Sequence, residues 1–268
     1  MAGLVPAIHV LFHAAKAWMP GTRPGMTLSE GKRMPTIKVM SAGAVKSMVV
    51  ALGAEFDRDG DDTLDLNFGT AGALGERVKN GENSDLVVLS QSAIAALAGL
   101  GLVVPATVTD LGRTVTGVIV REGAPRPDIS TPDAFIEALR KARNVAYTDP
   151  KAGGSGGIMF AALLQKLGLA DLVNAKAVLG KGGADVSQIV ADGRAELGTT
   201  FISEALPVKG LTVVGPLPGE LHNTNTYTAA VHAKASNPAG AEAFLRKLIG
   251  PATRLRWSEA GLEPAFPA

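Results

Sequence analysis

The sequence of 268 residues contains no cysteine, four histidines and few aromatic residues. The absence of cysteine excludes disulfide bonds, iron–sulfur clusters and zinc sites with thiolate ligands, and it is compatible with an oxidising or a reducing compartment. Four histidines leave little material for a histidine metal site, and an aromatic content of 4% disfavours surfaces on which bases or sugars stack. We therefore expect neither a metal nor another cofactor.

The chain also lacks a surplus of charge and a long apolar run. Lys and Arg number 26 against 25 Asp and Glu, whereas a nucleic-acid binder that neutralises phosphates needs a basic surplus. No stretch approaches the roughly 20 apolar residues of a membrane-spanning helix. We expect no nucleic-acid partner and no insertion into a membrane. The hydrophobic content of 46% predicts a globular protein with a large core.

The first 33 residues differ from the rest of the chain. They contain a single acidic residue, Glu30, and no sustained helix or strand pattern. An apolar stretch at residues 5–15 is interrupted by His9 and His13, and no Lys or Arg precedes it, so it does not match a secretory signal peptide. We expect residues 1–34 to be a disordered tail or a misassigned start, with Met34 as the true beginning.

From residue 36 onward, predicted strands and helices alternate in two sets. In the first set, apolar periodicity predicts strands at 37–40, 64–68 and 85–89 and helices at 44–56, 74–79 and 92–99. In the second set, it predicts strands at 144–148, 176–179 and 197–201 and helices at 155–167 and 186–192. This order is typical of parallel sheets covered by helices.

Two β-branched runs flank the second set, at residues 113–120 and 225–231. Helices are predicted after them, one beginning near Thr131 and two at 238–249 and 252–260. Two long strands around the middle of the chain indicate two crossings between lobes. We therefore predict an α/β protein of two lobes, each with a parallel sheet at its core, joined by two crossover strands.

Three glycine-rich turns each connect a predicted strand to a predicted helix. They are residues 41–47 (SAGAVKS), 68–74 (FGTAGAL) and 152–157 (AGGSGG). Main-chain N–H groups at a helix start have no partner within the helix, and the helix dipole adds partial positive charge there. One such turn more often serves close packing, but three at equivalent strand ends indicate an anion site beyond the carboxyl ends of the strands.

Several charged residues near these turns have two interpretations. Glu204 follows a predicted strand and is a candidate base, although a Glu in the first turn of a helix also stabilises the helix dipole. Lys46 and Lys151 follow glycine turns and are candidates to pair with a carboxylate ligand, or they are simply solvated. Asp149 precedes a proline and is typical of a turn. His222 lies near the second crossover, where an exposed loop histidine is the simpler interpretation.

Six segments resemble the type 2 periplasmic solute-binding proteins, most of all their molybdate-binding branch. These segments are 37–46 (IKVMSAGAVK), 68–77 (FGTAGALGER), 84–88 (SDLVV), 145–150 (VAYTDP), 196–198 (ELG) and 214–218 (VGPLP). The resemblance implies two hinged lobes that close on an oxyanion held by Ser and Thr hydroxyls and by N–H groups at helix starts. We expect lobe I at 35–116 plus 228–268 and lobe II at 117–227.

The resemblance places ligand contacts on ten residues. They are Ser41, Gly43, Ala44, Thr70, Ala71, Ser155, Gly156, Asp185, Val186 and Phe201. The molybdate branch usually has a serine in the loop that holds Gly43 and Ala44, and a tyrosine where this chain has Phe201. Both differences remove hydrogen-bond donors for a tetrahedral oxyanion. We therefore expect an organic anion, such as a small di- or tricarboxylate, and we assign no catalytic residue.

Three functional classes remain open on the sequence. The first is a small-anion-binding component of an ABC-type transporter, with a membrane permease as partner. The second is a cofactor-independent isomerase of a small unsaturated tricarboxylic acid, similar to aconitate isomerase, on the same scaffold. The third is a ligand-sensing effector domain, but no helix-turn-helix precedes Met34. The resemblance implies a periplasmic location, the lack of a signal-peptide pattern leaves a cytoplasmic one, and we expect a monomer.

Overall fold

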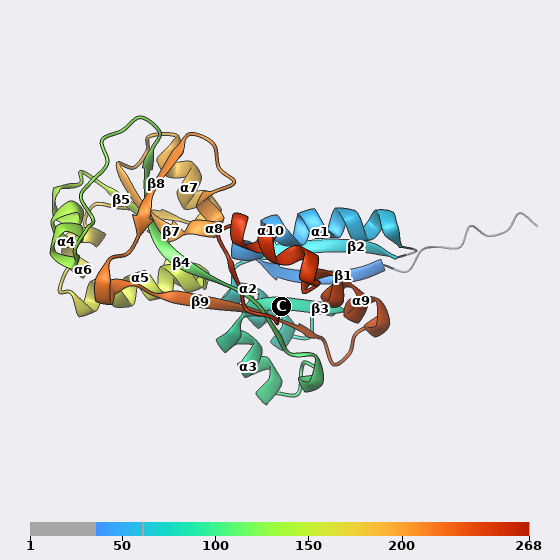
Figure 1. The fold of residues 1–268 in the computed structure, drawn as a ribbon. Coiled ribbons are helices and arrows are strands. Elements are labelled where there is room, and N and C mark those ends of the chain that lie inside the picture. Colours follow the sequence, from blue (N-terminus) through green and yellow to red (C-terminus); the bar gives the residue numbers. More distant parts are fainter. Residues whose placement is uncertain (1–35, 61, 268) are drawn as a thin grey trace, which may run out of the picture. The chain divides into compact units, whose positions relative to one another are not determined.

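The computed structural model describes residues 36–60 and 62–267 and confirms the predicted α/β architecture (Figure 1). The expectation for residues 1–34 lies outside the described residues. The strands are β1 Thr36–Ala42, β2 Thr63–Gly69, β3 Leu86–Ser90, β4 Thr109–Arg121, β5 Val145–Thr148, β6 Ala177–Gly180, β7 Leu197–Phe201, β8 Leu211–Pro216, β9 Thr224–Val231 and β10 Glu263–Pro264. The helices are α1 Lys46–Asp59, α2 Ala71–Lys79, α3 Gln91–Gly99, α4 Pro132–Lys141, α5 Ser155–Lys166, α6 Ala170–Asn174, α7 Gly183–Ala191, α8 Ile202–Ala205, α9 Pro238–Leu248 and α10 Arg254–Glu259. The short 3₁₀ helix η1 Gly43–Val45 precedes α1.

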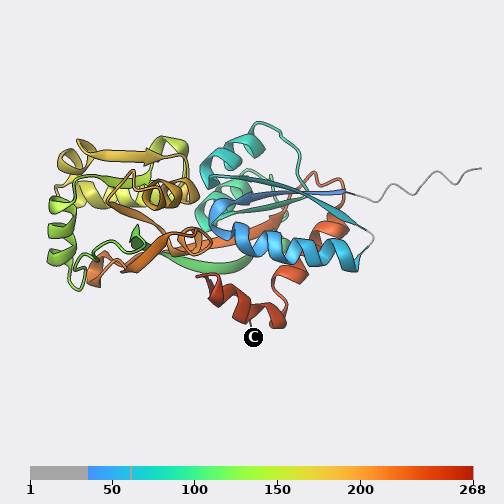
Figure 2. The same cartoon turned by 90° about the horizontal axis from the view of Figure 1, so that it is seen from above.

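The strands form two parallel groups that are joined through antiparallel strands. β2, β1 and β3 are parallel neighbours, and β6, β5 and β7 form the second parallel group. β9 is antiparallel to β3, and β4 pairs with β9 through its first half and with β7 and β8 through its second half. β4 and β9 run between the two lobes in both views (Figures 1 and 2). The two crossover strands are thus present, while the residue ranges of the lobes stay a prediction.

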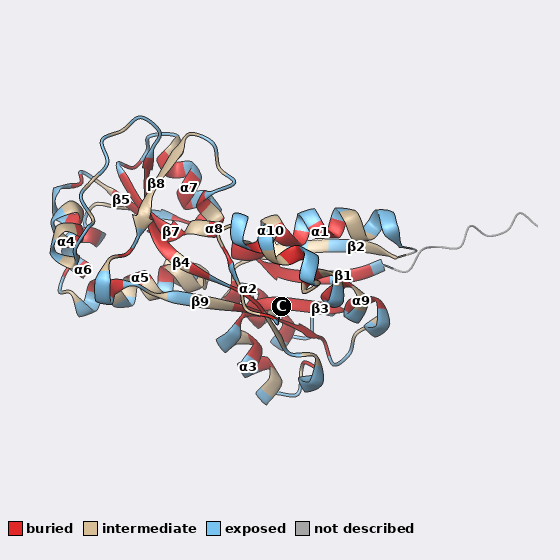
Figure 3. Cartoon of the chain, in the orientation of Figure 1, coloured by how far each residue is buried: buried red, intermediate tan, exposed pale blue. Residues whose placement is uncertain are grey.

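Helices cover both faces of each parallel group, so the inner strands β3, β5 and β7 are buried along their whole length, whereas the edge strands β2 and β6 are mostly half-buried (Figure 3). In the first group, Ile37 and Val87 share one core with Trp257 of α10. In the second group the side chains of β5 alternate: Val145 packs into the core that contains α4 and α5, whereas Ala146 packs into the core beneath α7. This burial on both faces explains why β3 reads as an apolar run (LVVL) in the sequence.

Four short elements were not expected from the sequence: β8, β10, α6 and α8. β8 contains a glycine and a proline and is held by pairing with β4, and α8 is a single helical turn after β7. β8 and α8 are too short to show a hydrophobic periodicity in the sequence, so tertiary contacts determine that they form. α8 matters for function because it carries Glu204. Within residues 36–60 and 62–267, no helix combines the length and apolar character that a membrane crossing requires.

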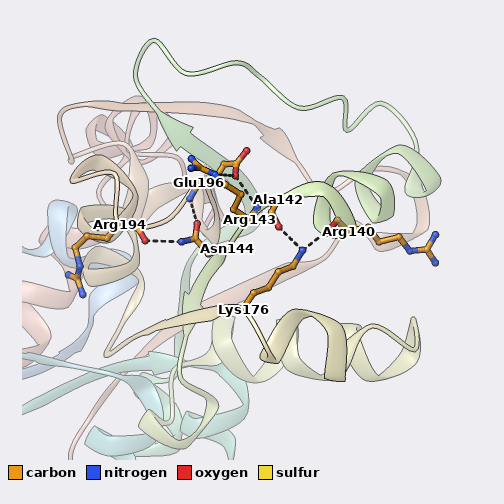
Figure 4. A network of polar contacts seen from close by, with 7 residues as sticks. All are labelled: Arg140, Ala142, Arg143, Asn144, Lys176, Arg194 and Glu196. Carbon is orange, nitrogen blue, oxygen red and sulfur yellow. Dashed lines mark hydrogen bonds and ion pairs between the residues drawn. The ribbon is translucent and has the colours of Figure 1, made fainter.

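A polar network lies at the amino ends of β5, β6 and β7 (Figure 4). The main-chain N–H and the Nε of Arg143 donate to Oε2 of Glu196 at 2.9 and 3.0 Å, and the N–H of Glu196 donates to Oδ1 of Asn144 at 2.8 Å. Lys176 donates to two main-chain carbonyls at the end of α4. The hydrogen bonds from Arg143, the main-chain one first, lower the pKa of Glu196. The network therefore links the segments that precede β5, β6 and β7, at the end of the sheet opposite to the carboxyl ends of these strands.

Candidate ligand-binding site

A cavity of about 260 Å³ lies between the two lobes, beyond the carboxyl ends of strands from both parallel groups. Its wall is formed by residues that follow β1 and β2 and by residues at the ends of β5, β6 and β7. Sites for drug-sized ligands usually measure about 300–1,000 Å³. This cavity therefore suits a small ligand.

Seven of the ten predicted contact residues line this one cavity. They are Gly43, Ala44, Thr70, Ala71, Ser155, Gly156 and Phe201. They come from four separate segments, so the fold brings together the three glycine turns and the end of β7. Whether each residue contacts a ligand stays a prediction.

The other three predicted residues do not line the cavity. The hydroxyl of Ser41 is buried and donates to the neighbouring carbonyl of Ala42 at 3.3 Å. The carboxylate of Asp185 accepts from the N–H of Lys181 at 2.8 Å, and the N–H of Val186 donates to the carbonyl of Gly182 at 3.0 Å. The α7 segment lines the cavity through residues 181–184 instead. The expected position is displaced because α7 begins at Gly183 rather than at residue 186.

Four helical segments begin at the cavity: η1 with α1, α2, α5 and α7. The first N–H groups of each have no partner within their helix, and the helix dipoles add partial positive charge. The N-cap of α2 is Thr70, whose Oγ1 accepts from the N–H of Ala73 at 3.3 Å. The same hydroxyl donates to the carbonyl of Ala152 across the cleft. Thr70 therefore links the two lobes, and its hydroxyl proton is already engaged.

The glycine turns of the two lobes touch each other directly. The N–H of Gly72 donates to the carbonyl of Gly153 at 2.9 Å. A Cβ on Gly72 would lie 2.8 Å from that carbonyl oxygen, which is closer than a real Cβ approaches. Glycine at position 72 is thus required for this contact between the lobes.

Glu204 is the acidic residue among those that line the cavity. Its two carboxyl oxygens lie against glycines of opposite lobes, because a Cβ on Gly43 would lie 3.0 Å from Oε1 and a Cβ on Gly183 would lie 2.1 Å from Oε2. The side chain keeps part of its surface exposed, but it lies deep between the lobes. Desolvation there raises the pKa of Glu204 to about 7, although a hydrogen bond from the N–H of Gly183 opposes the rise.

Tyr227 also lines the cavity and was not among the predicted contacts. It is buried in β9, and its ring packs edge to face against Phe201 with centroids 6.3 Å apart. Burial, and next the charge of nearby Glu204, raise the pKa of Tyr227, so its hydroxyl stays neutral. Tyr227 thus places a neutral hydroxyl in the cavity wall beside Phe201, from a strand separated from β7 by β4. No local sequence pattern indicates this, because β9 is distant in sequence from β7.

Two lysines supply positive charge at the cavity wall. Lys46 and Lys181 are both exposed and both line the cavity. The Nζ atom of Lys46 lies 5.2 Å from the ring centre of Phe68, a cation–π distance that holds the ammonium group near the cavity. Among the residues that the structure describes, no group of His, Asp or Glu side chains is arranged to hold a metal ion.

The chain belongs to the bacterial extracellular solute-binding protein family. The family model of that description matches residues 37–263, and the fold is that of the type 2 periplasmic binding proteins. An aconitate isomerase from a Pseudomonas species is 31% identical over 85% of this chain and 88% of its own length. A putative ABC transporter substrate-binding lipoprotein from Bacillus subtilis is 21% identical over 79% of this chain and 80% of its own length.

A solved structure shares the fold at lower sequence identity. The periplasmic molybdate-binding protein of Azotobacter vinelandii superposes with a TM-score of 0.70 and 19% identity, over 87% of this chain and 100% of that chain. This similarity shows the fold and does not identify the ligand.

Proposed function

We propose that this protein binds a small anion with two or three carboxylate groups in the cavity between its lobes, as the substrate-binding component of an ABC-type transporter. The observation that carries this proposal is the convergence of four helix N-termini on one small cavity. Unpaired N–H groups and helix dipoles favour an anion. Membership of a solute-binding family supports a membrane permease as the partner.

The chemistry of the wall favours carboxylates over a tetrahedral oxyanion. A compact oxyanion needs several hydroxyl and N–H donors at short range, but Ala44 replaces a hydroxyl and the Thr70 hydroxyl donates to a carbonyl. Lys46 and Lys181 lie at separate positions of the wall. Two separated cations suit a ligand whose negative charges are themselves separated.

A thermal-shift screen at pH 6 tests the proposal. Its probes are citrate, trans-aconitate, propane-1,2,3-tricarboxylate, molybdate and sulfate. Binding at 100 times the dissociation constant stabilises the folded protein by about 2.7 kcal/mol. We expect the tricarboxylates to raise the Tm and the inorganic oxyanions to have little effect. A larger shift with molybdate would contradict the proposal.

A second candidate function is the isomerisation of an unsaturated tricarboxylic acid in the same cavity. Two observations favour it: the 31% identity to a protein named aconitate isomerase, and a cavity carboxyl whose pKa of about 7 suits proton transfer near neutral pH. In this reaction the carboxylate of Glu204 takes a proton from the CH₂ group beside the double bond. The double bond moves, and Glu204 returns the proton to the former vinylic carbon.

Incubation of trans-aconitate with the protein in D₂O distinguishes binding from isomerisation. An isomerase gives cis-aconitate, visible by NMR, and Glu204→Gln abolishes its formation. Deuterium enters the carbon chain to the extent that the proton on Glu204 exchanges with D₂O before it is returned. A simple binding protein leaves the carbon-bound protons of trans-aconitate unchanged, which would eliminate the second candidate.

A further inference from the structure

The carboxyl group of Glu204 is at odds with a cavity otherwise built for an anion. Four helix starts and two lysines favour negative charge, and the wall then adds a carboxylate of its own. In the described part of the chain, no Lys or Arg forms an ion pair with Glu204. An ionised Glu204 and an anionic ligand would therefore repel each other at short range, at a carboxyl group that burial already desolvates.

The groups around Glu204 leave it able to hold a proton. Gly43 and Gly183 bring main chain, not charge, against its two oxygens. The oxygen of the Thr200 hydroxyl lies against the same Gly183 and has no hydrogen-bond partner, so it is available to the carboxyl group. The other titratable groups facing this region are Lys46 from α1, Lys181 before α7 and the neutral Tyr227 from β9.

Glu204 is also in contact with solvent away from the cavity. Together with Gly43, Lys46 and Ala184 it lines a second hollow of about 330 Å³, whose wall includes Pro207. The carboxyl group thus lies between the ligand cavity and another opening of the surface. A proton can reach it from that side when a ligand fills the cavity.

We infer that Glu204 takes up one proton from solvent when a carboxylate ligand enters the cavity, and that the neutral carboxylic acid then donates a hydrogen bond to the ligand. The inference rests on the proposed carboxylate-binding function and deepens it. The O–H bond forms on a Glu204 oxygen with a proton from the buffer, and no other bond changes. The protein then selects anions that accept a hydrogen bond, and it binds them more tightly as the pH falls.

Isothermal titration calorimetry with propane-1,2,3-tricarboxylate tests this. The probe has no double bond, so isomerisation cannot contribute heat. Titrations at pH 8 in phosphate and in Tris, which differ in ionisation enthalpy, give the number of protons taken up per ligand bound. With a pKa of about 7 in the empty cavity, we expect uptake of about 0.9 proton at pH 8 and binding roughly tenfold weaker at pH 8 than at pH 6.

Glu204→Gln removes the titration and keeps the shape of the side chain. We expect proton uptake by this variant to fall below about 0.2 and the pH dependence of its affinity to disappear. The exposed Glu122, changed to Gln as a matched control, keeps the wild-type values. Comparison at equal pH cancels any protonation of the probe itself, and circular dichroism checks the fold of both variants.

The possible results separate the two proposals. Binding by the wild type without proton uptake, with proton release, or with equal uptake in Glu204→Gln overturns the inference and leaves the proposed function in place. Failure of the wild type to bind the probe at both pH values overturns the proposed function and the inference with it. The wild-type measurement decides the matter even if the variant does not fold.

Discussion

The raised pKa of Glu204 predicts how the stability of the ligand-free protein depends on pH. The folded protein holds this proton up to a pH of about 7, whereas the usual pKa of the side chain is 4.5. The folded state therefore binds more protons than the unfolded chain in this range, and stability falls as the pH rises from 4.5 to about 7. Glu204→Gln cannot ionise, so the variant should not lose this part of the stability.

The magnitude follows from the size of the pKa change. One pKa step corresponds to about 1.4 kcal/mol, so the rise from 4.5 to about 7 sets an upper limit of about 3 kcal/mol. We expect Glu204→Gln to match the wild type at pH 4.5 and to be more stable at pH 8 by up to about 3 kcal/mol. The gain falls below this limit wherever water screens the exposed part of the side chain.

Urea unfolding followed by circular dichroism at pH 4.5, 6, 7 and 8 measures this difference. Glu122→Gln, at an exposed position after β4, is the control and should follow the wild-type curve at every pH. A difference between Glu204→Gln and the wild type that stays constant from pH 4.5 to 8 would refute the reasoning, because it would mean that Glu204 does not change its ionisation in this range.

Two further substitutions test how the glycine turns and Thr70 build the cavity. Gly183→Ala places a Cβ 2.1 Å from Oε2 of Glu204, so it should destabilise the fold by roughly 1–3 kcal/mol and weaken binding of propane-1,2,3-tricarboxylate. The matched control Gly99→Ala, at the exposed end of α3 and outside the cavity wall, meets nothing within 4 Å and should do neither. Thr70→Ala removes the N-cap of α2 and a hydrogen bond between the lobes, so it should lower stability by about 1 kcal/mol and reduce affinity. Thr131→Ala removes the N-cap of α4, so it should lower stability by a similar amount and leave affinity unchanged. Equal affinities for the two variants of either pair would contradict these assignments.

Much of the fold was predictable because the controlling signals are local. The buried strand β3 reads as an apolar run, so the strand predicted at 85–89 overlaps its observed range, and the strands predicted at 37–40 and 197–201 lie within β1 and β7. Thr131 before Pro132 marked the start of α4, since its hydroxyl caps that helix. The glycine turns indicated helix starts beyond strand ends, and parallel topology requires such ends to lie at one edge of the sheet. The ten contact residues came from the family resemblance, and the fold brings seven of them to one cavity.

The composition of the cavity wall depends on distances that no local pattern contains. Tyr227 enters from a strand that pairs with β3 and β4, and its position beside Phe201 follows from that pairing. The Thr70 hydroxyl looked available for a ligand in the sequence, yet across the cleft it donates to Ala152. Such contacts join segments from different parts of the chain, so only the packed lobes decide them.

Glu204 shows most clearly which properties depend on the sequence alone and which depend on the tertiary structure. The sequence by itself determined that an acidic residue follows β7 and that glycines occupy positions 43 and 183. The tertiary structure decided that both glycines close on the Glu204 carboxyl group, on α8, a turn too short to be predicted by period. Ionisation depends on desolvation, and desolvation is set by everything packed around a group rather than by its neighbours in sequence. The raised pKa of Glu204 is therefore a property of the folded cleft alone.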